Sequence, residues 1–240
     1  MPATFYLQSH VFLCRARRHW VILDVNRDKY LSVDRGQFES LGPWLHGWEG
    51  GAGCVADDPG AAADGALALA NSLLSVAILS ERADGAKPAR ATALATPMAA
   101  ADVDLPANAR KPALAHVMAF FLSAAKADRQ LRGQLFRSIV ADVQARKRRK
   151  EAPGPRFDWD RARALVEVFD RLRLFYPRPY LCLFDSLALL HFLARYGLYP
   201  DWVFGVTADP FEAHCWVQAG RVVLNDTLER VSAFTPIMGV

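Results

Sequence analysis

One cysteine in the C-terminal half stands where a helix is expected to begin. Pro177 and Pro179 interrupt the chain ahead of Cys182, and leucines recur with helical spacing from there to Tyr196. The first turn of a helix has backbone N–H groups without helical acceptors, and its dipole favours an anion. A thiol with an ordinary pKa of about 8.5 is therefore pushed toward the thiolate at this position. Taken alone, the pattern also suits a small residue that fills core space.

A histidine on an expected strand supplies a partner for that thiol. Residues 211–218 have the pattern of a strand, and Gly220 separates them from a further strand at 221–224. Because side chains alternate between the two faces of a strand, His214 and Cys215 point in opposite directions. We therefore expect Cys215 to pack in the core, and Cys182 to be the nucleophile that His214 serves.

The register of this hairpin decides which residue orients His214. A three-residue loop over 218–220, with Gly220 in the left-handed position, puts His214 and Asp226 on one face, a diagonal step apart. A two-residue loop instead puts Asn225 opposite His214. Both Asp and Asn can orient an imidazole in a Cys–His enzyme. The glycine in third position favours the first register, so we predict Asp226 and keep Asn225 as the alternative.

Composition limits the classes of protein that fit. The formal net charge is only +4 over 240 residues, which is a mild basic bias and argues against nucleic-acid binding. Residues 1–18 lack the features of a signal peptide, and no apolar run is long enough for membrane insertion. The four cysteines have neither metal-type spacing nor a disulfide framework. We expect a cytoplasmic protein with reduced thiols, no metal and no cofactor.

The first 82 residues have the pattern of a small domain built from a β-hairpin and helices. Asn26, Arg27 and Asp28 suit a tight turn between two strands. The expected strands are 5–7, 11–15, 20–25 and 29–33, the expected helices are 35–45 and 67–77, and residues 78–80 close the second helix or form a strand.

Residues 83–108 are rich in Ala, Pro and Thr and predict an irregular linker, so that residues 109–240 make up a second domain. A basic run at 146–150 ends one of its helices and is expected to be solvated, since cations suit the C-terminal dipole. His191 is half a helical turn away from Cys182 and faces away from the thiol. The expected helices are 113–126, 134–146, 158–175 and 182–196, and the expected strands are 201–206, 211–218 and 221–224.

Several anchored blocks follow one another in the second half, namely Cys182-Leu183-x-x-Ser186-Leu187-Ala188-Leu189, Gly197, Phe204-Gly205-Val206, Pro210-Phe211, Ala213-His214-x-Trp216-Val217 and Leu224-Asn225-Asp226. These blocks resemble the lasso-peptide B protein family, which consists of transglutaminase-like, papain-related cysteine peptidases. The first 80 residues resemble the PqqD-like peptide-recognition element that is fused to the peptidase in many members. Three positions depart from the family pattern, namely Asp185, Cys215 and Gln218.

The resemblance implies an α+β fold in which a winged-helix-like, PqqD-like domain precedes a papain/transglutaminase-like domain with an N-terminal catalytic helix and an antiparallel sheet. It implies that Cys182 is the nucleophile, that His214 is the general base and acid, and that Asp226 orients His214. The implied substrate is a lasso-peptide precursor whose leader is removed. The implied partner is an ATP-dependent, asparagine-synthetase-like cyclase, which closes the core peptide into a lactam ring.

Two further groups of residues follow from that mechanism. The backbone N–H of Cys182 is the expected oxyanion donor, with Tyr176 or Tyr180 as a second donor. An extended leader is expected to add as a strand beside residues 29–33 and to rest against the following helix. Two other functions use the same features, namely acyl transfer by the same triad and a non-catalytic scaffold that only binds the leader. The expected leader-binding residues are Lys29, Tyr30, Leu31, Ser32, Val33, Leu69 and Leu73.

Overall fold

The computed structural model describes residues 4–49, 59–101, 112–150 and 157–240. The chain divides into two compact units, each described here by itself. The first comprises Met1–Leu94, Val206–Glu212 and Thr235–Met238, and the second comprises Ala95–Gly205, Ala213–Phe234 and Gly239–Val240.

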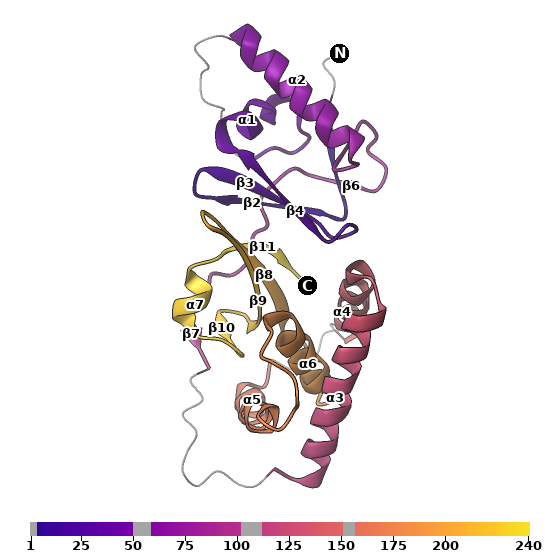
Figure 1. The fold of residues 1–240 in the computed structure, drawn as a ribbon, viewed down its shortest axis with the longest axis vertical. Coiled ribbons are helices and arrows are strands. Elements are labelled where there is room, and N and C mark those ends of the chain that lie inside the picture. Colours follow the sequence, from indigo (N-terminus) through magenta and orange to yellow (C-terminus); the bar gives the residue numbers. More distant parts are fainter. Residues whose placement is uncertain (1–3, 50–58, 102–111, 151–156) are drawn as a thin grey trace. The chain divides into compact units, whose positions relative to one another are not determined.

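A three-stranded antiparallel sheet is the centre of the first unit (Figure 1). Its strands are β2 (Val11–Ala16), β3 (His19–Asp24) and β4 (Lys29–Asp34), in the order β2-β3-β4. Within the described chain, β4 is therefore an edge strand. A smaller sheet has the order β5-β1-β6, from β1 (Tyr6–Gln8), β5 (Leu79–Ser80) and β6 (Ala86–Lys87).

Helices complete the first unit and enclose its core. α1 (Arg35–Ser40) begins after Asp34, whose side chain accepts hydrogen bonds from two N–H groups of the first turn. A 3-10 turn, η1 (Gly42–Trp44), and α2 (Pro59–Ser75) follow. Leu73 of α2 is only 1% exposed and belongs to the core that contains Trp20 and Phe38. The side chain of Leu73 therefore does not lie on a free surface, contrary to the prediction that it contacts a leader.

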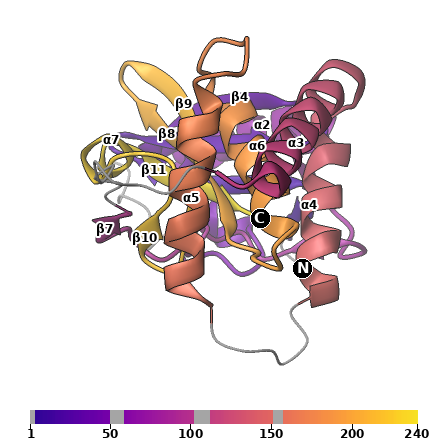
Figure 2. The same cartoon turned by 90° about the horizontal axis from the view of Figure 1, so that it is seen from below.

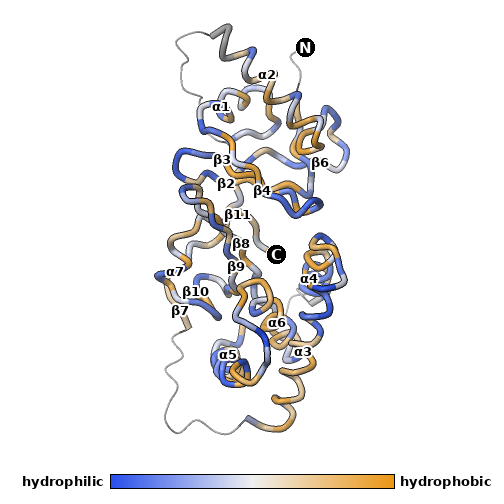
Figure 3. Tube along the Cα trace, viewed as in Figure 1, coloured by the Kyte–Doolittle hydropathy of each residue, from blue (hydrophilic) through white to orange (hydrophobic). Residues whose placement is uncertain are grey.

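Helices form much of the second unit (Figure 2). α3 (Leu114–Gly133) packs along α6 (Cys182–Ala194), and α4 (Phe136–Lys150) and α5 (Trp159–Arg173) also belong to this unit. α6 is hydrophobic along most of its length (Figure 3), and nearly every side chain from Phe184 to Leu193 is buried. α6 begins at Cys182 as the sequence predicts.

A five-stranded sheet has the strand order β11-β8-β9-β10-β7. β7 runs parallel to β10, so the sheet is mixed rather than antiparallel as predicted. β6 and β7 lie within the predicted irregular linker, of which residues 102–108 are outside the described residues. The bounds are β7 Ala99–Ala100, β8 Asp201–Ala208, β9 Phe211–Ala219, β10 Val222–Val223, α7 Leu228–Ser232 and β11 Thr235–Gly239.

Candidate active site

The start of α6 presents the Cys182 thiol at the end of a buried helix. Leu181 is the N-cap residue and makes no side-chain capping bond, so the first turn keeps backbone N–H groups for other acceptors. The N–H of Leu181 donates instead to Asp185 Oδ2, at 2.8 Å. Ser186, one helical turn after Cys182, donates a hydrogen bond from its hydroxyl to the carbonyl of Cys182. These bonds fix the backbone on both sides of the thiol.

His214 on β9 is bound to Asp226. The distance from His214 Nε2 to Asp226 Oδ2 is 2.5 Å, and His214 is 5% exposed. Asn225 has a different partner, because its Oδ1 accepts from the N–H of Val217 at 2.7 Å. Of the two orienting residues considered from sequence, the structure therefore joins Asp226 to His214.

The hairpin register that led to this choice was wrong. Val222 pairs with Ala219, which leaves a two-residue loop of Gly220 and Arg221. Gly220 has φ +55° and takes the first loop position, where glycine suits a two-residue hairpin. Beyond β10 the chain bends, and Asp226 meets His214 from this bend rather than from a paired strand.

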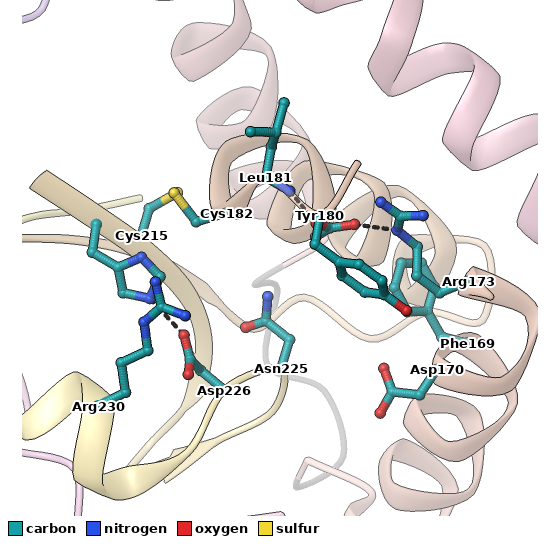
Figure 4. A pocket seen from close by; sticks show the side chains of 12 residues that line it. Phe169, Asp170, Arg173, Tyr180, Leu181, Cys182, Cys215, Asn225, Asp226 and Arg230 are labelled. Atoms are coloured by element: carbon teal, nitrogen blue, oxygen red, sulfur yellow. Dashed lines mark hydrogen bonds and ion pairs between the residues drawn. The ribbon is translucent and has the colours of Figure 1, made fainter. Parts of the chain in front are cut away.

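A cavity of about 200 Å³ opens beside these groups (Figure 4). In the figure, Cys182 and Cys215 lie at one end of the cavity and Asp170 at the other. Tyr180 lines the cavity but Tyr176 does not; the ring of Tyr176 stacks on Phe184, with the centroids 5.4 Å apart. Its lining residues are Phe169, Asp170, Arg173, Tyr180, Leu181, Cys182, Asp185, His214, Cys215, Asn225, Asp226 and Arg230.

Cys215 is buried as expected, yet its thiol is hydrogen-bonded to Cys182. The side chains of Cys182 and Cys215 point toward each other (Figure 4). Cys215 Sγ also lies 3.4 Å from the hydroxyl of Ser186. Strand alternation predicted correctly that Cys215 is buried, but it missed this contact because α6 packs against the β9 face that carries Cys215.

The surroundings of Cys182 favour its thiolate. The hydrogen bond from the Cys215 thiol is the largest influence and lowers the pKa of Cys182, while burial opposes it. The hydrogen bond with His214 and the charge of His214 lower it further, to about 4. Burial and the bond to Cys182 raise the pKa of Cys215 well above its usual value. Cys215 therefore stays protonated and donates to the thiolate.

The imidazole of His214 is held in its protonated form. Burial alone would lower its pKa, but the hydrogen bonds with Asp226 and Cys182, together with their charges, raise the pKa of His214 to about 9. For Asp226 burial acts to raise the pKa, and the bonds from His214 and from the Thr227 N–H outweigh it and lower the pKa. Between about pH 4 and pH 9 the site thus holds a thiolate and an imidazolium.

A buried arginine that no sequence pattern singled out supports the segment ahead of Cys182. Arg173 is 3% exposed, and its Nε donates to Asp185 Oδ1. The same guanidinium donates to three carbonyls of the preceding loop, those of Tyr176, Arg178 and Pro179. Sequence periodicity indicates which face of α5 is apolar, but not that a cation lies on it.

A model of the transglutaminase-like superfamily matches residues 121–239, so this part of the chain carries a transglutaminase-like domain. The match includes Cys182, His214 and Asp226. No curated protein and no solved structure was found to match the chain.

Among the described residues, no three His, Cys, Asp or Glu side chains gather in an arrangement that could hold a metal ion. None of the helices in that part of the chain is both long and apolar enough to cross a membrane. Cys54 lies outside the described residues, and the other three cysteines are free thiols.

Proposed function

We propose that this protein is a cysteine peptidase that removes the leader from a ribosomally made lasso-peptide precursor. The observation that carries the proposal is the thiolate–imidazolium pair of Cys182 and His214, with Asp226 bound to the far ring nitrogen. The transglutaminase-like domain supports acyl chemistry at a cysteine. The choice of a lasso precursor rests on the resemblance of the sequence blocks around these residues.

In the proposed reaction the Cys182 thiolate attacks the carbonyl carbon at the junction between leader and core. The negative charge moves to the carbonyl oxygen, and the N–H of Cys182 at the start of α6 is positioned to stabilise it. His214 gives its proton to the leaving amine, which frees the core peptide and leaves the leader as a thioester. His214 then takes a proton from water, and the hydroxide releases the leader acid.

The first unit is proposed to hold the leader. β4 is an edge strand whose side chains are mostly exposed, and Leu31 is 41% exposed on it. An extended peptide can add to such an edge through main-chain hydrogen bonds. Leu69 of α2 is partly buried against the core and lies beside the fully buried Leu73, so it offers less surface than predicted. We propose that β4 supplies most of the leader contact, in a PqqD-like manner.

The test is incubation of the precursor peptide with the wild-type protein, Cys182→Ala and the control Cys14→Ala, read by mass spectrometry. We expect one cut in the wild type and Cys14→Ala, and none in Cys182→Ala. Cys14 is a buried thiol of the first unit, so its variant controls for the loss of any cysteine. Leader binding without a cut, with and without the ATP-dependent cyclase, would contradict the peptidase and favour a scaffold.

Acyl transfer is the second candidate, because the same domain class and the same three residues can deliver the thioester to an amine. The mass of the leader product separates the two reactions. Hydrolysis gives the free leader acid, whereas transfer to an added amine gives an amide.

A further inference from the structure

A second cavity, also of about 200 Å³, lies among α3, α4 and α6 in the second unit. It shares no lining residue with the catalytic cavity. Three of its lining residues are basic. Lys126 lies on α3, Arg146 lies on α4, and Arg195 directly follows α6. The lining residues are Ser123, Lys126, Arg146, His191, Ala194 and Arg195.

His191 is a neutral acceptor in this cavity. Burial, followed by the charges of Arg146, Lys126 and Arg195, lowers the pKa of His191 to about 2. Its Nδ1 therefore accepts from Arg146 Nη1 at 2.8 Å, and its Nε2 donates to Gln130 Oε1 at 2.5 Å. His191 thus fixes the position of the Arg146 guanidinium without adding a charge of its own.

The three cations are not balanced by acidic groups. Arg146 Nη2 is buried and has no hydrogen-bond partner among the described residues. Burial and then the charge of Arg146 lower the pKa of Lys126, and Arg195 adds to that effect. Asp142 is the carboxylate that acts on both Lys126 and Arg146. The charge of Asp142 acts to raise the pKa of Lys126 and of Arg146, but burial and the neighbouring cations outweigh it for Lys126, and burial outweighs it for Arg146.

The basic run at 146–150 was predicted to be a solvated helix end, and Arg146 differs from that prediction. Its guanidinium turns inward to His191, and Lys147 is paired with Asp201. Arg148 and Arg149 are exposed, as predicted. Of the described residues of this run, Arg146 is the one that lines the cavity.

We propose that this cavity binds a phosphate-type oxyanion, either inorganic phosphate or the phosphoryl group of a larger molecule. A phosphate carries close to two negative charges and accepts hydrogen bonds from several directions. Guanidinium forks match its oxygens, and an ammonium adds a point charge. A planar carboxylate with a single charge would offset only one of the three cations. The bound oxyanion satisfies Arg146 Nη2 and removes the repulsion that acts on Lys126.

The experiment is calorimetric titration of the full-length protein with inorganic phosphate and pyrophosphate, with ionic strength held constant by chloride. We expect saturable binding at one site, weakened about tenfold or more by Arg195→Gln and by Arg146→Gln. Arg195 lines the cavity and is exposed, so its variant tests the site even if Arg146→Gln impairs folding. Arg149→Gln removes the same charge from an exposed position of α4 and should bind as the wild type does.

The source of the phosphoryl group is resolved by a further titration with ADP. Tighter binding of ADP than of pyrophosphate identifies a nucleotide, and equal or weaker binding identifies the free anion. Three results would overturn the proposal: no saturable binding of any phosphate compound, equal weakening by Arg149→Gln and Arg195→Gln, or tighter binding of succinate than of phosphate.

Discussion

Cys215 favours the thiolate form of Cys182, the proposed nucleophile. Its protonated thiol donates to Cys182, and that bond is the largest influence on the pKa of Cys182. We therefore expect Cys215→Ala to raise the pKa of Cys182, and Cys215→Ser, which keeps a donor, to raise it less. The measurement is the pH dependence of alkylation of Cys182 by iodoacetamide, with Cys182→Ala to identify the signal. An unchanged pKa in Cys215→Ala would show that the contact has no electrostatic role.

The pair of Cys182 and His214 sets the pH range of the reaction. The lowered pKa of Cys182 means that the thiolate is present above about pH 4, and the raised pKa of His214 means that the imidazolium is present below about pH 9. We expect kcat/KM for precursor cleavage to rise through the first value and to fall through the second. A profile with a single rising limb near pH 8.5 would instead indicate an ordinary thiol.

Asp226 helps to raise the pKa of His214, and so it affects the pH at which kcat/KM is expected to fall. Asp226→Asn removes the charge that helps to raise the pKa of His214, so the falling limb should move to lower pH. We expect kcat/KM to fall on the order of a hundredfold, since the orientation of the imidazole is also weakened. Asn225→Ala is the matched comparison, because Asn225 bonds the Val217 N–H and not the imidazole. If Asn225→Ala moved the falling limb of the kcat/KM profile and Asp226→Asn did not, Asn225 rather than Asp226 would be the residue that acts on His214.

At the scale of elements, local signals in the sequence located the site better than long-range ones. The prolines before Cys182 and the leucine spacing after it predicted the start of α6, since helix limits depend on neighbouring residues. The register of β9 and β10 depends on which residues enter the loop, and the position of Gly220 fits more than one loop length. Asp226 was chosen through a wrong register, so its contact with His214 is a result of the structure.

The loop ahead of α6 depends on Arg173. Its guanidinium binds Asp185 and three loop carbonyls while almost fully buried. Arg173→Met leaves Asp185 and these carbonyls without their donor, and removal of one partner of a buried pair typically costs about 3–5 kcal/mol. We expect a loss of that size in the free energy of unfolding, measured with urea. Arg173→Met/Asp185→Leu should recover part of it, because no unpaired carboxylate remains.

A matched variant separates the buried network from surface charge. Arg163→Met removes a cation from an exposed position of the same helix, where a substitution changes the free energy of unfolding by about 0.5 kcal/mol or less. Arg163→Met should therefore cost much less than Arg173→Met. Equal losses would mean that the loop does not depend on the buried guanidinium.

At the scale of the whole molecule, the first unit is not a simple N-terminal segment. It contains residues 206–212 and 235–238 as well as the first 94 residues. This grouping cannot be predicted from composition, because the sequence shows composition shifts along the chain, not which distant segments group together. A truncation at residue 82 would therefore remove most of one unit and leave three of its segments behind, residues 83–94, 206–212 and 235–238, so a point variant tests leader binding more cleanly.

Leu31 on β4 is the position for that variant. It is exposed on an edge strand, where an added peptide strand would lie beside it. Leu31→Glu places a charge against the apolar side chains of a docked leader and should raise KM about tenfold or more, with kcat nearly unchanged. Gln37→Glu adds the same charge at an exposed position of α1 and should leave both constants unchanged. If the two variants raised KM equally, general repulsion would explain the effect. If neither raised it, the leader would have to bind elsewhere than β4, while the roles of Cys182 and His214 would stand.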